Sequence, residues 1–251
     1  MSAIPIEASA GAAAKDSPQR TGTVQVWDLP LRIFHWALVL AIVAAYVTAE
    51  FGGSEWAQWH GRIGAVVLAL LVFRLVWGFI GTHHARFASF APTPSRIAAY
   101  LRGRWQRAGH NPLGALSVFA LLFVVAAQVT TGLFANDDIA FAGPWSDWVS
   151  QSTSDRLTGW HQQIFYVLAG FIGLHLVAIL FYLLIRKSNL VSPMITGKQA
   201  VVAAPPAATK HLTARFIVAV LIAVATSWLA FRDAPTARAE AATPPAATAD
   251  W

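Results

Sequence analysis

Long apolar stretches separated by short polar connections occupy most of the chain. Four of them, at residues 31–49, 59–80, 113–134 and 160–185, contain few charged side chains. A helix needs about 20 mainly apolar residues to cross the hydrocarbon core of a bilayer, so each stretch is long enough to span it. A fifth apolar stretch, residues 216–231, is shorter. The pattern predicts an all-α membrane protein in which a bundle of four transmembrane helices is followed by a fifth, C-terminal transmembrane helix.

Composition supports a membrane protein and narrows its chemistry. Of the 251 residues, 56% are apolar and 12% are charged, whereas about a quarter of residues are charged in soluble domains. The chain has no cysteine, which excludes a thiolate-bound iron–sulfur cluster, covalent haem attachment through Cys-x-x-Cys-His, a disulfide and a cysteine nucleophile. Any metal or haem would therefore be held by histidine.

The segments outside the four-helix region are rich in alanine with serine or proline, a composition typical of disordered tails and linkers. The fifth apolar segment is followed by Ala-Arg-Ala, which imitates a signal-peptide cleavage site, but a plain membrane anchor is the favoured interpretation. The predicted units are a disordered tail at residues 1–22, a four-helix membrane domain at 23–198, a linker at 199–214, the fifth helix at 215–232 and a disordered tail at 233–251.

Charged residues divide the connections into two kinds. The connection at residues 81–112 and the segment 186–215 carry arginine and lysine and no acidic residue. The other two connections carry the acidic residues Glu50, Glu55, Asp137, Asp138, Asp147 and Asp155. Because basic loops stay in the cytoplasm, we expect a cytoplasmic N-terminus, and a periplasmic C-terminus if the fifth helix spans. The net charge of +6 is then a topology signal rather than evidence for a nucleic-acid partner.

Half of the eight histidines fall in or at the edge of apolar helices, where an imidazole is an unusual side chain. These four are His35, His60, His161 and His175. The other four lie in polar connections and are predicted to be solvated surface groups, namely His83, His84, His110 and His211.

Helix geometry sorts the four membrane histidines into two pairs by depth. The 14 residues from His161 to His175 span about 21 Å and return to nearly the same helix face, so the two side chains lie near opposite leaflets. With the predicted topology, His60 is level with His161 near the outer surface, and His35 is level with His175 near the inner surface. Each pair offers two imidazole nitrogens, which suits the axial positions of a haem iron better than a zinc ion with four ligands.

A single histidine in a membrane helix is commonly a packed or hydrogen-bonding group, whereas four histidines at two matched depths favour two non-covalent haems b. Arg74, at the depth of the inner pair, and Arg62 or Arg156, near the outer pair, are candidate partners for haem propionates. The alternative for Arg74 is that it snorkels to the interface. Gln128, Thr130 and Thr131 could hydrogen-bond a quinone or a haem group, although bonds between neighbouring helices are the favoured interpretation.

Several segments in a fixed order resemble a known family. They are "VWDLPLRIFHW", "WHGRIGAVVLALLVFRLVWGFIGTHHARF", "GHNPLGALSVFALLF", "TGLF" and "WHQQIFYVLAGFIGLHLVAILFY". Over residues 24–198 their order and spacing resemble the bacterial cytochrome b561 family, which includes the b-type subunits of nickel–iron hydrogenases. The resemblance implies a four-helix bundle that holds two non-covalent haems b, with His35 paired with His175 and His60 paired with His161.

The resemblance also implies a function, because family members move electrons between the membrane quinone pool and a redox partner. We therefore expect an electron-transfer subunit of the bacterial inner membrane, with quinol as a substrate and a periplasmic c-type cytochrome or a hydrogenase as partner. The alternative is a haem-containing membrane anchor or assembly subunit without quinone chemistry of its own. A histidine-based metal transporter is disfavoured because the helices contain almost no carboxylates. Whether the chain is an enzyme by itself and whether it forms a homodimer are left open.

Overall fold

The computed structural model describes residues 21–51, 53–105, 109–139, 141–202 and 212–232. Five helices in these segments are long and apolar enough to cross a membrane, namely α1 (Leu29–Glu50), α2 (Ser54–Ile80), α5 (Pro112–Leu133), α6 (Gln151–Leu184) and α8 (Leu212–Phe231). They confirm the predicted all-α membrane bundle and its fifth helix. Most of the predicted linker and nearly all of both predicted tails lie outside the described residues.

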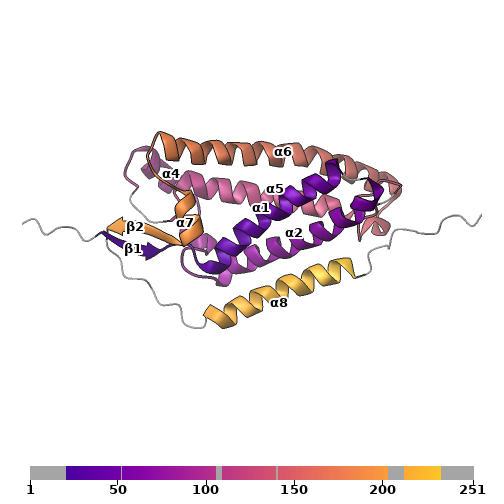
Figure 1. The fold of residues 1–251 in the computed structure, drawn as a ribbon, viewed down its shortest axis with the longest axis horizontal. Coiled ribbons are helices and arrows are strands. Elements are labelled where there is room, and N and C mark those ends of the chain that lie inside the picture. Colours follow the sequence, from indigo (N-terminus) through magenta and orange to yellow (C-terminus); the bar gives the residue numbers. More distant parts are fainter. Residues whose placement is uncertain (1–20, 52, 106–108, 140, 203–211, 233–251) are drawn as a thin grey trace, which may run out of the picture.

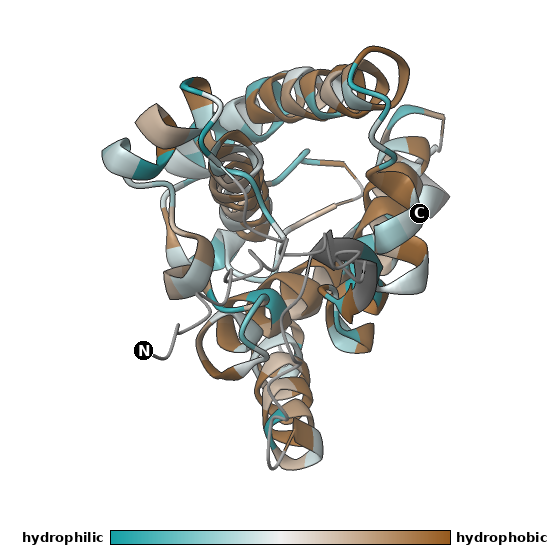
Figure 2. Ribbon diagram, turned by 90° about the vertical axis from the view of Figure 1, so that its left-hand side faces the viewer, coloured by the Kyte–Doolittle hydropathy of each residue, from teal (hydrophilic) through white to brown (hydrophobic). Residues whose placement is uncertain are grey.

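The long helices form two hairpins, α1 with α2 and α5 with α6, which meet where α2 packs against α5. Helix α8 lies along α2 at the edge of the bundle (Figure 1). Hydrophobic residues run along the spans and hydrophilic residues gather in the connections (Figure 2). This distribution suits helices whose backbone groups are satisfied internally while their side chains face hydrocarbon.

Polar caps set where α1 and α5 begin. The Asp28 carboxylate accepts the amide of Leu31 at 2.8 Å, and the Asn111 side chain likewise accepts the amide three residues further on at 2.7 Å. Both helices have proline in the first turn, where no amide hydrogen is needed. Asp28 also accepts hydrogen bonds from Trp77 Nε1 at 3.0 Å and Thr82 Oγ1 at 2.6 Å, which fastens the start of α1 to the end of α2.

One end of the bundle, called the basic end below, carries three short helices in its connections. They are α3 (Phe87–Phe90), α4 (Pro94–Leu101) and α7 (Val191–Thr196). The opposite, acidic end holds the turn between α1 and α2 and the longer loop between α5 and α6, which includes the 3-10 helix η1 (Ser146–Trp148). Helix α6 begins at Gln151 rather than at the predicted residue 160, because Ser150 caps it and its polar first turns extend beyond the apolar stretch.

A two-stranded antiparallel ribbon at the basic end was not anticipated from the sequence. Strand β1 (Thr21–Gln25) pairs with β2 (Lys198–Val202), with Gln25 opposite Lys198. Gly197 makes the return possible because its φ of +82° is rarely adopted by other residues. Its carbonyl accepts the Val26 and Trp27 amides at 2.9 and 3.2 Å, and a Cβ at this position would lie 2.7 Å from the Trp27 carbonyl oxygen.

Helix α8 packs on α2 through small side chains. The buried residues of α8 are Ala219, Ala223, Ser227 and Ala230. Small residues let membrane helices approach closely, and here the Ser227 hydroxyl donates to the Ala65 carbonyl of α2 at 2.7 Å. The fifth span is therefore a packed part of the bundle.

Candidate functional site

His60 of α2 and His161 of α6 lie side by side near the acidic end of the bundle. Their ring centroids are 6.1 Å apart and their planes are inclined by 88°. Both side chains are partly buried. Two residues 101 positions apart (161 − 60) are thus brought together by the packing of the two hairpins, as the depth argument predicted.

Each of these imidazoles is held by a backbone carbonyl of the neighbouring helix in its own hairpin. His60 Nδ1 lies 2.9 Å from the Ala45 carbonyl oxygen of α1, and His161 Nδ1 lies 2.9 Å from the Gln128 carbonyl oxygen of α5. A carbonyl oxygen only accepts hydrogen bonds, so Nδ1 must carry the hydrogen in both rings. In the neutral imidazole, Nε2 then keeps the lone pair that can bind a metal.

The spacing of the outer pair fits one iron between two imidazoles. A metal–nitrogen bond of about 2 Å and about 1 Å from Nε2 to the ring centre place the centroids of two axial imidazoles about 6 Å apart, and the observed separation is 6.1 Å. Gly132 of α5 is needed for this arrangement, because a Cβ there would lie 2.8 Å from Cε1 of His161. The residues present therefore fit a bis-histidine haem.

The Gln128 side chain also approaches the outer pair. Its Nε2 lies 3.1 Å from Nε2 of His161, so the amide donates to the nitrogen that would otherwise bind a metal. The Gln128 Oε1 atom is buried and has no hydrogen-bond partner among the described residues. A buried amide oxygen without a partner is costly.

The predicted inner pair consists of His35 of α1 and His175 of α6. His35 Nδ1 is buried and has no hydrogen-bond partner in the part of the chain that the structure describes. Because His161 and His175 belong to the same helix, α6 carries one residue of each pair and separates the two sites by about 21 Å.

Comparison with known proteins identifies the family. The family model described as prokaryotic cytochrome b561 matches residues 26–197. The chain belongs to the prokaryotic cytochrome b561 family. The protein is accordingly a multi-pass membrane cytochrome of the b type, that is, a haem b electron-transfer subunit.

Several curated relatives resemble this cytochrome over most of their length. The protein named "Probable Ni/Fe-hydrogenase B-type cytochrome subunit" of Azotobacter chroococcum mcd 1 is 24% identical over 220 residues, and the match covers 73% of this chain and 91% of the relative. The protein of the same name from Cupriavidus necator is 26% identical over 207 residues, covering 68% and 85%. "Probable Ni/Fe-hydrogenase 1 B-type cytochrome subunit" of Escherichia coli K12 is 21% identical over 211 residues, covering 68% and 88%. No solved structure matches.

Two of the arginines considered for haem propionates, Arg74 and Arg62, differ in their surroundings. Arg74 is only 2% exposed, so it does not snorkel to solvent. Its Nη1 donates to the Ala85 carbonyl at 3.2 Å, and its guanidinium lies 4.5 Å from the centre of the Phe87 ring. Arg62 is exposed and lies 4.9 Å from the centre of the Trp59 ring. Their roles toward propionates remain predictions.

One loop histidine of the cytochrome is not the solvated group that the sequence suggested. His110 packs between Trp27 and Phe90, with ring centroids 4.4 Å away on each side. Burial lowers the pKa of His110 to about 3, and the nearby charges of Arg74 and His84 act in the same direction. The expectation was wrong because the ring is covered by residues from two distant segments, which no local pattern indicates. His211 lies outside the described residues.

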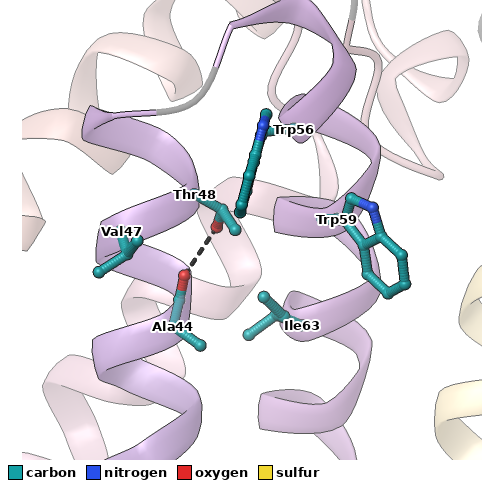
Figure 3. A pocket seen from close by; sticks show the side chains of 6 residues that line it. All are labelled: Ala44, Val47, Thr48, Trp56, Trp59 and Ile63. Atoms are coloured by element: carbon teal, nitrogen blue, oxygen red, sulfur yellow. Dashed lines mark hydrogen bonds between the residues drawn. The ribbon is translucent and has the colours of Figure 1, made fainter.

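A groove between α1 and α2 lies beside the outer pair. It has a volume of about 300 Å³ and is lined by Ala44, Val47, Thr48, Trp56, Trp59 and Ile63. Figure 3 shows Thr48 and Ile63 pointing into the space between the two helices, with Trp56 above them. The Thr48 hydroxyl lies 3.5 Å from His60 Nδ1. The sequence analysis missed Thr48, although it stands 12 residues before His60 (60 − 48), across the tight turn of the hairpin.

Proposed function

We propose that this cytochrome carries electrons across the bacterial inner membrane through two bis-histidine haem b sites, between the quinone pool and a redox partner at the acidic end. The outer site is formed by His60 and His161, and the inner site by His35 and His175. The observation that carries the proposal is the outer pair, in which both Nδ1 atoms are held by carbonyls and the ring centroids are 6.1 Å apart.

The chain's own residues hold and insulate the sites. Carbonyl anchoring of Nδ1 fixes the tautomer and leaves the Nε2 lone pairs of His60 and His161 for a metal, as outer-shell hydrogen bonds do at metal sites. Bound haem supplies an iron that gains and loses one electron. Helix α6 fixes the distance between the sites because it bears His161 and His175. The apolar bundle excludes water, so the potentials are set by ligation, burial and nearby charge.

The ends of the bundle support the orientation and the partner. Basic connections at one end support a cytoplasmic N-terminus, and a crossing by α8 would put the C-terminus in the periplasm. Five of the described carboxylates at the acidic end are exposed, namely Glu50, Asp137, Asp138, Asp147 and Asp155. Such a surface complements a basic c-type cytochrome and would also accept a hydrogenase subunit with a basic face. The relatives named as hydrogenase cytochrome subunits favour partners of this kind.

The family match over residues 26–197 supports the proposed extent of the functional unit. We assign the haem-binding unit to residues 23–198, because the match ends at residue 197. The segment 215–232, most of α8, is then an additional span that packs on α2. The groove beside His60 supports a quinone link, because it is apolar and reaches Thr48 next to the outer pair.

Reduction by quinol tests the proposal against its alternative. Full-length protein in liposomes would be mixed with a short-chain quinol analogue, and haem absorbance would be followed. We expect quinol to reduce the haems of the natural protein. In His161→Ala, which should lack the outer haem, the absorbance change of that haem should be absent. If dithionite reduces the haems but quinol does not, the protein is a haem-containing anchor or assembly subunit whose electrons come from another subunit.

A further inference from the structure

The same hydrogen-bond arrangement occurs twice around the outer histidines. In α1, the Thr48 hydroxyl lies 2.8 Å from the Ala44 carbonyl oxygen and 3.0 Å from that of Ala45. The Ala45 carbonyl is also the partner of His60 Nδ1, at 2.9 Å. Thr48 is 6% exposed and lies 3.5 Å from the same nitrogen. One carbonyl thus serves both the threonine and the imidazole.

Helix α5 repeats this arrangement at the second histidine. The Thr131 hydroxyl lies 2.8 Å from the Ala127 carbonyl oxygen and 3.0 Å from that of Gln128. The Gln128 carbonyl is also the partner of His161 Nδ1, at 2.9 Å. Thr131 is 6% exposed and lies 3.3 Å from that nitrogen. In both hairpins, the carbonyl three residues before a buried threonine holds the histidine of the next long helix.

Threonine in a membrane helix routinely bonds to a carbonyl one turn earlier, so that bond alone means little. Here, however, the shared carbonyl also orients a histidine, and this happens at both histidines of one pair. Thr130, beside Thr131 in the sequence, is exposed instead. The inner site differs, since His35 Nδ1 has no hydrogen-bond partner among the described residues.

Sharing the carbonyl affects how strongly the histidine donates electrons. A hydrogen bond from Nδ1 to an acceptor raises the basicity of a ligating imidazole. Greater electron donation by the ligand favours ferric over ferrous iron and lowers the reduction potential. A hydroxyl that donates to the same carbonyl weakens its pull on the Nδ1 hydrogen. The threonine therefore keeps the imidazole a weaker donor than an unshared carbonyl would make it.

We propose that Thr48 and Thr131 are a matched pair of positioning residues that orient His60 and His161 and raise the reduction potential of the outer haem. The inference rests on the proposed bis-histidine sites. It concerns a one-electron reduction in which neither threonine exchanges a proton or forms a bond. Neither hydroxyl touches the iron in this account, because each acts through the carbonyl that holds the ligand.

Redox titration of full-length protein tests the pair. Thr48→Val and Thr131→Val remove the hydroxyl and keep the branched shape, Thr48→Ser and Thr131→Ser retain the hydroxyl, and Thr130→Val is the matched control. We expect both valine variants to lower the midpoint potential of the same haem, the one lost in His60→Ala. The serine variants and the control should titrate like the natural protein.

The outcomes separate this inference from the proposed function. Absence of haem from the natural protein would defeat the proposed function itself. Three results would overturn the threonine inference alone. They are two haems with unchanged potentials in both valine variants, a rise in the potential, and shifts in two different haems. If the valine variants lose the outer haem, retention of that haem in the serine variants supports positioning by the hydroxyl. Loss of the outer haem from the serine variants as well would overturn the threonine inference.

Discussion

The imidazole rings of His60 and His161 are inclined by 88° to each other with their centroids 6.1 Å apart. When two axial imidazole planes are perpendicular, two of the iron d orbitals stay close in energy, which makes the low-spin ferric signal highly anisotropic. We predict such a signal for the outer site in the electron paramagnetic resonance spectrum of the oxidised protein. A rhombic spectrum, which is typical of parallel imidazole planes, would contradict this geometry. The signal is assigned to the outer site if it is lost in His60→Ala.

Single substitutions test the pairing of the four histidines. His60→Ala and His161→Ala should each remove the outer haem, and His35→Ala and His175→Ala should each remove the inner one. Each variant should keep about half of the haem, because a bis-histidine site with one ligand holds it poorly. Haem content and the potential of the remaining haem are the measurements, with the exposed His83→Ala as control. Loss of different haems within one pair would overturn the assignment.

The close approach of α5 and α6 depends on Gly132. A Cβ at this position would lie 2.8 Å from Cε1 of His161, so Gly132→Ala should push the ring aside and remove about half of the haem. Gly159→Ala is a matched control in α6, because nothing lies within 4 Å of a Cβ there. Equal haem content in the two variants would show that the ring has room to move.

The partly buried ring of His110 should make stability depend on pH. Its pKa is about 3 in the folded protein and about 6.5 when exposed, so the unfolded chain binds more protons between these values. Stability is therefore lost as the pH falls below about 6.5. His110→Phe should unfold at a temperature that changes less between about pH 7 and about pH 5. The control His83→Phe, at an exposed position, should keep the pH dependence of the unfolding temperature. If His110→Phe also keeps it, the His110 ring is not its cause.

Most of the fold could be predicted from local patterns. Four apolar stretches gave the spans of α1, α2, α5 and α6, because membrane helices must be long and apolar whatever they pack against. The match of the His60 and His161 depths followed from helix geometry and the predicted topology, and the structure brings these rings together. The coarse function also followed, since the family membership expected from five short segments is confirmed.

Features made by contacts between distant segments could not be predicted in this way. Strands β1 and β2 pair across more than 170 residues (198 − 25 = 173), and β2 stands in a segment whose alanine content suggests a linker. Burial of His110 requires Trp27 and Phe90 to meet around it. The role of Thr48 depends on which backbone carbonyl meets His60, and that is set by the packing of the hairpin rather than by residue type.

The ratio of haem to polypeptide in the purified full-length protein tests the central claim most directly. Pyridine haemochrome analysis and an oxidised-minus-reduced spectrum would be recorded after expression with an adequate haem supply. We expect two non-covalent haems b per chain, both low-spin with two nitrogen ligands. A chain that binds one haem or none under these conditions would contradict the pairing of His60 with His161 and of His35 with His175 as haem ligands.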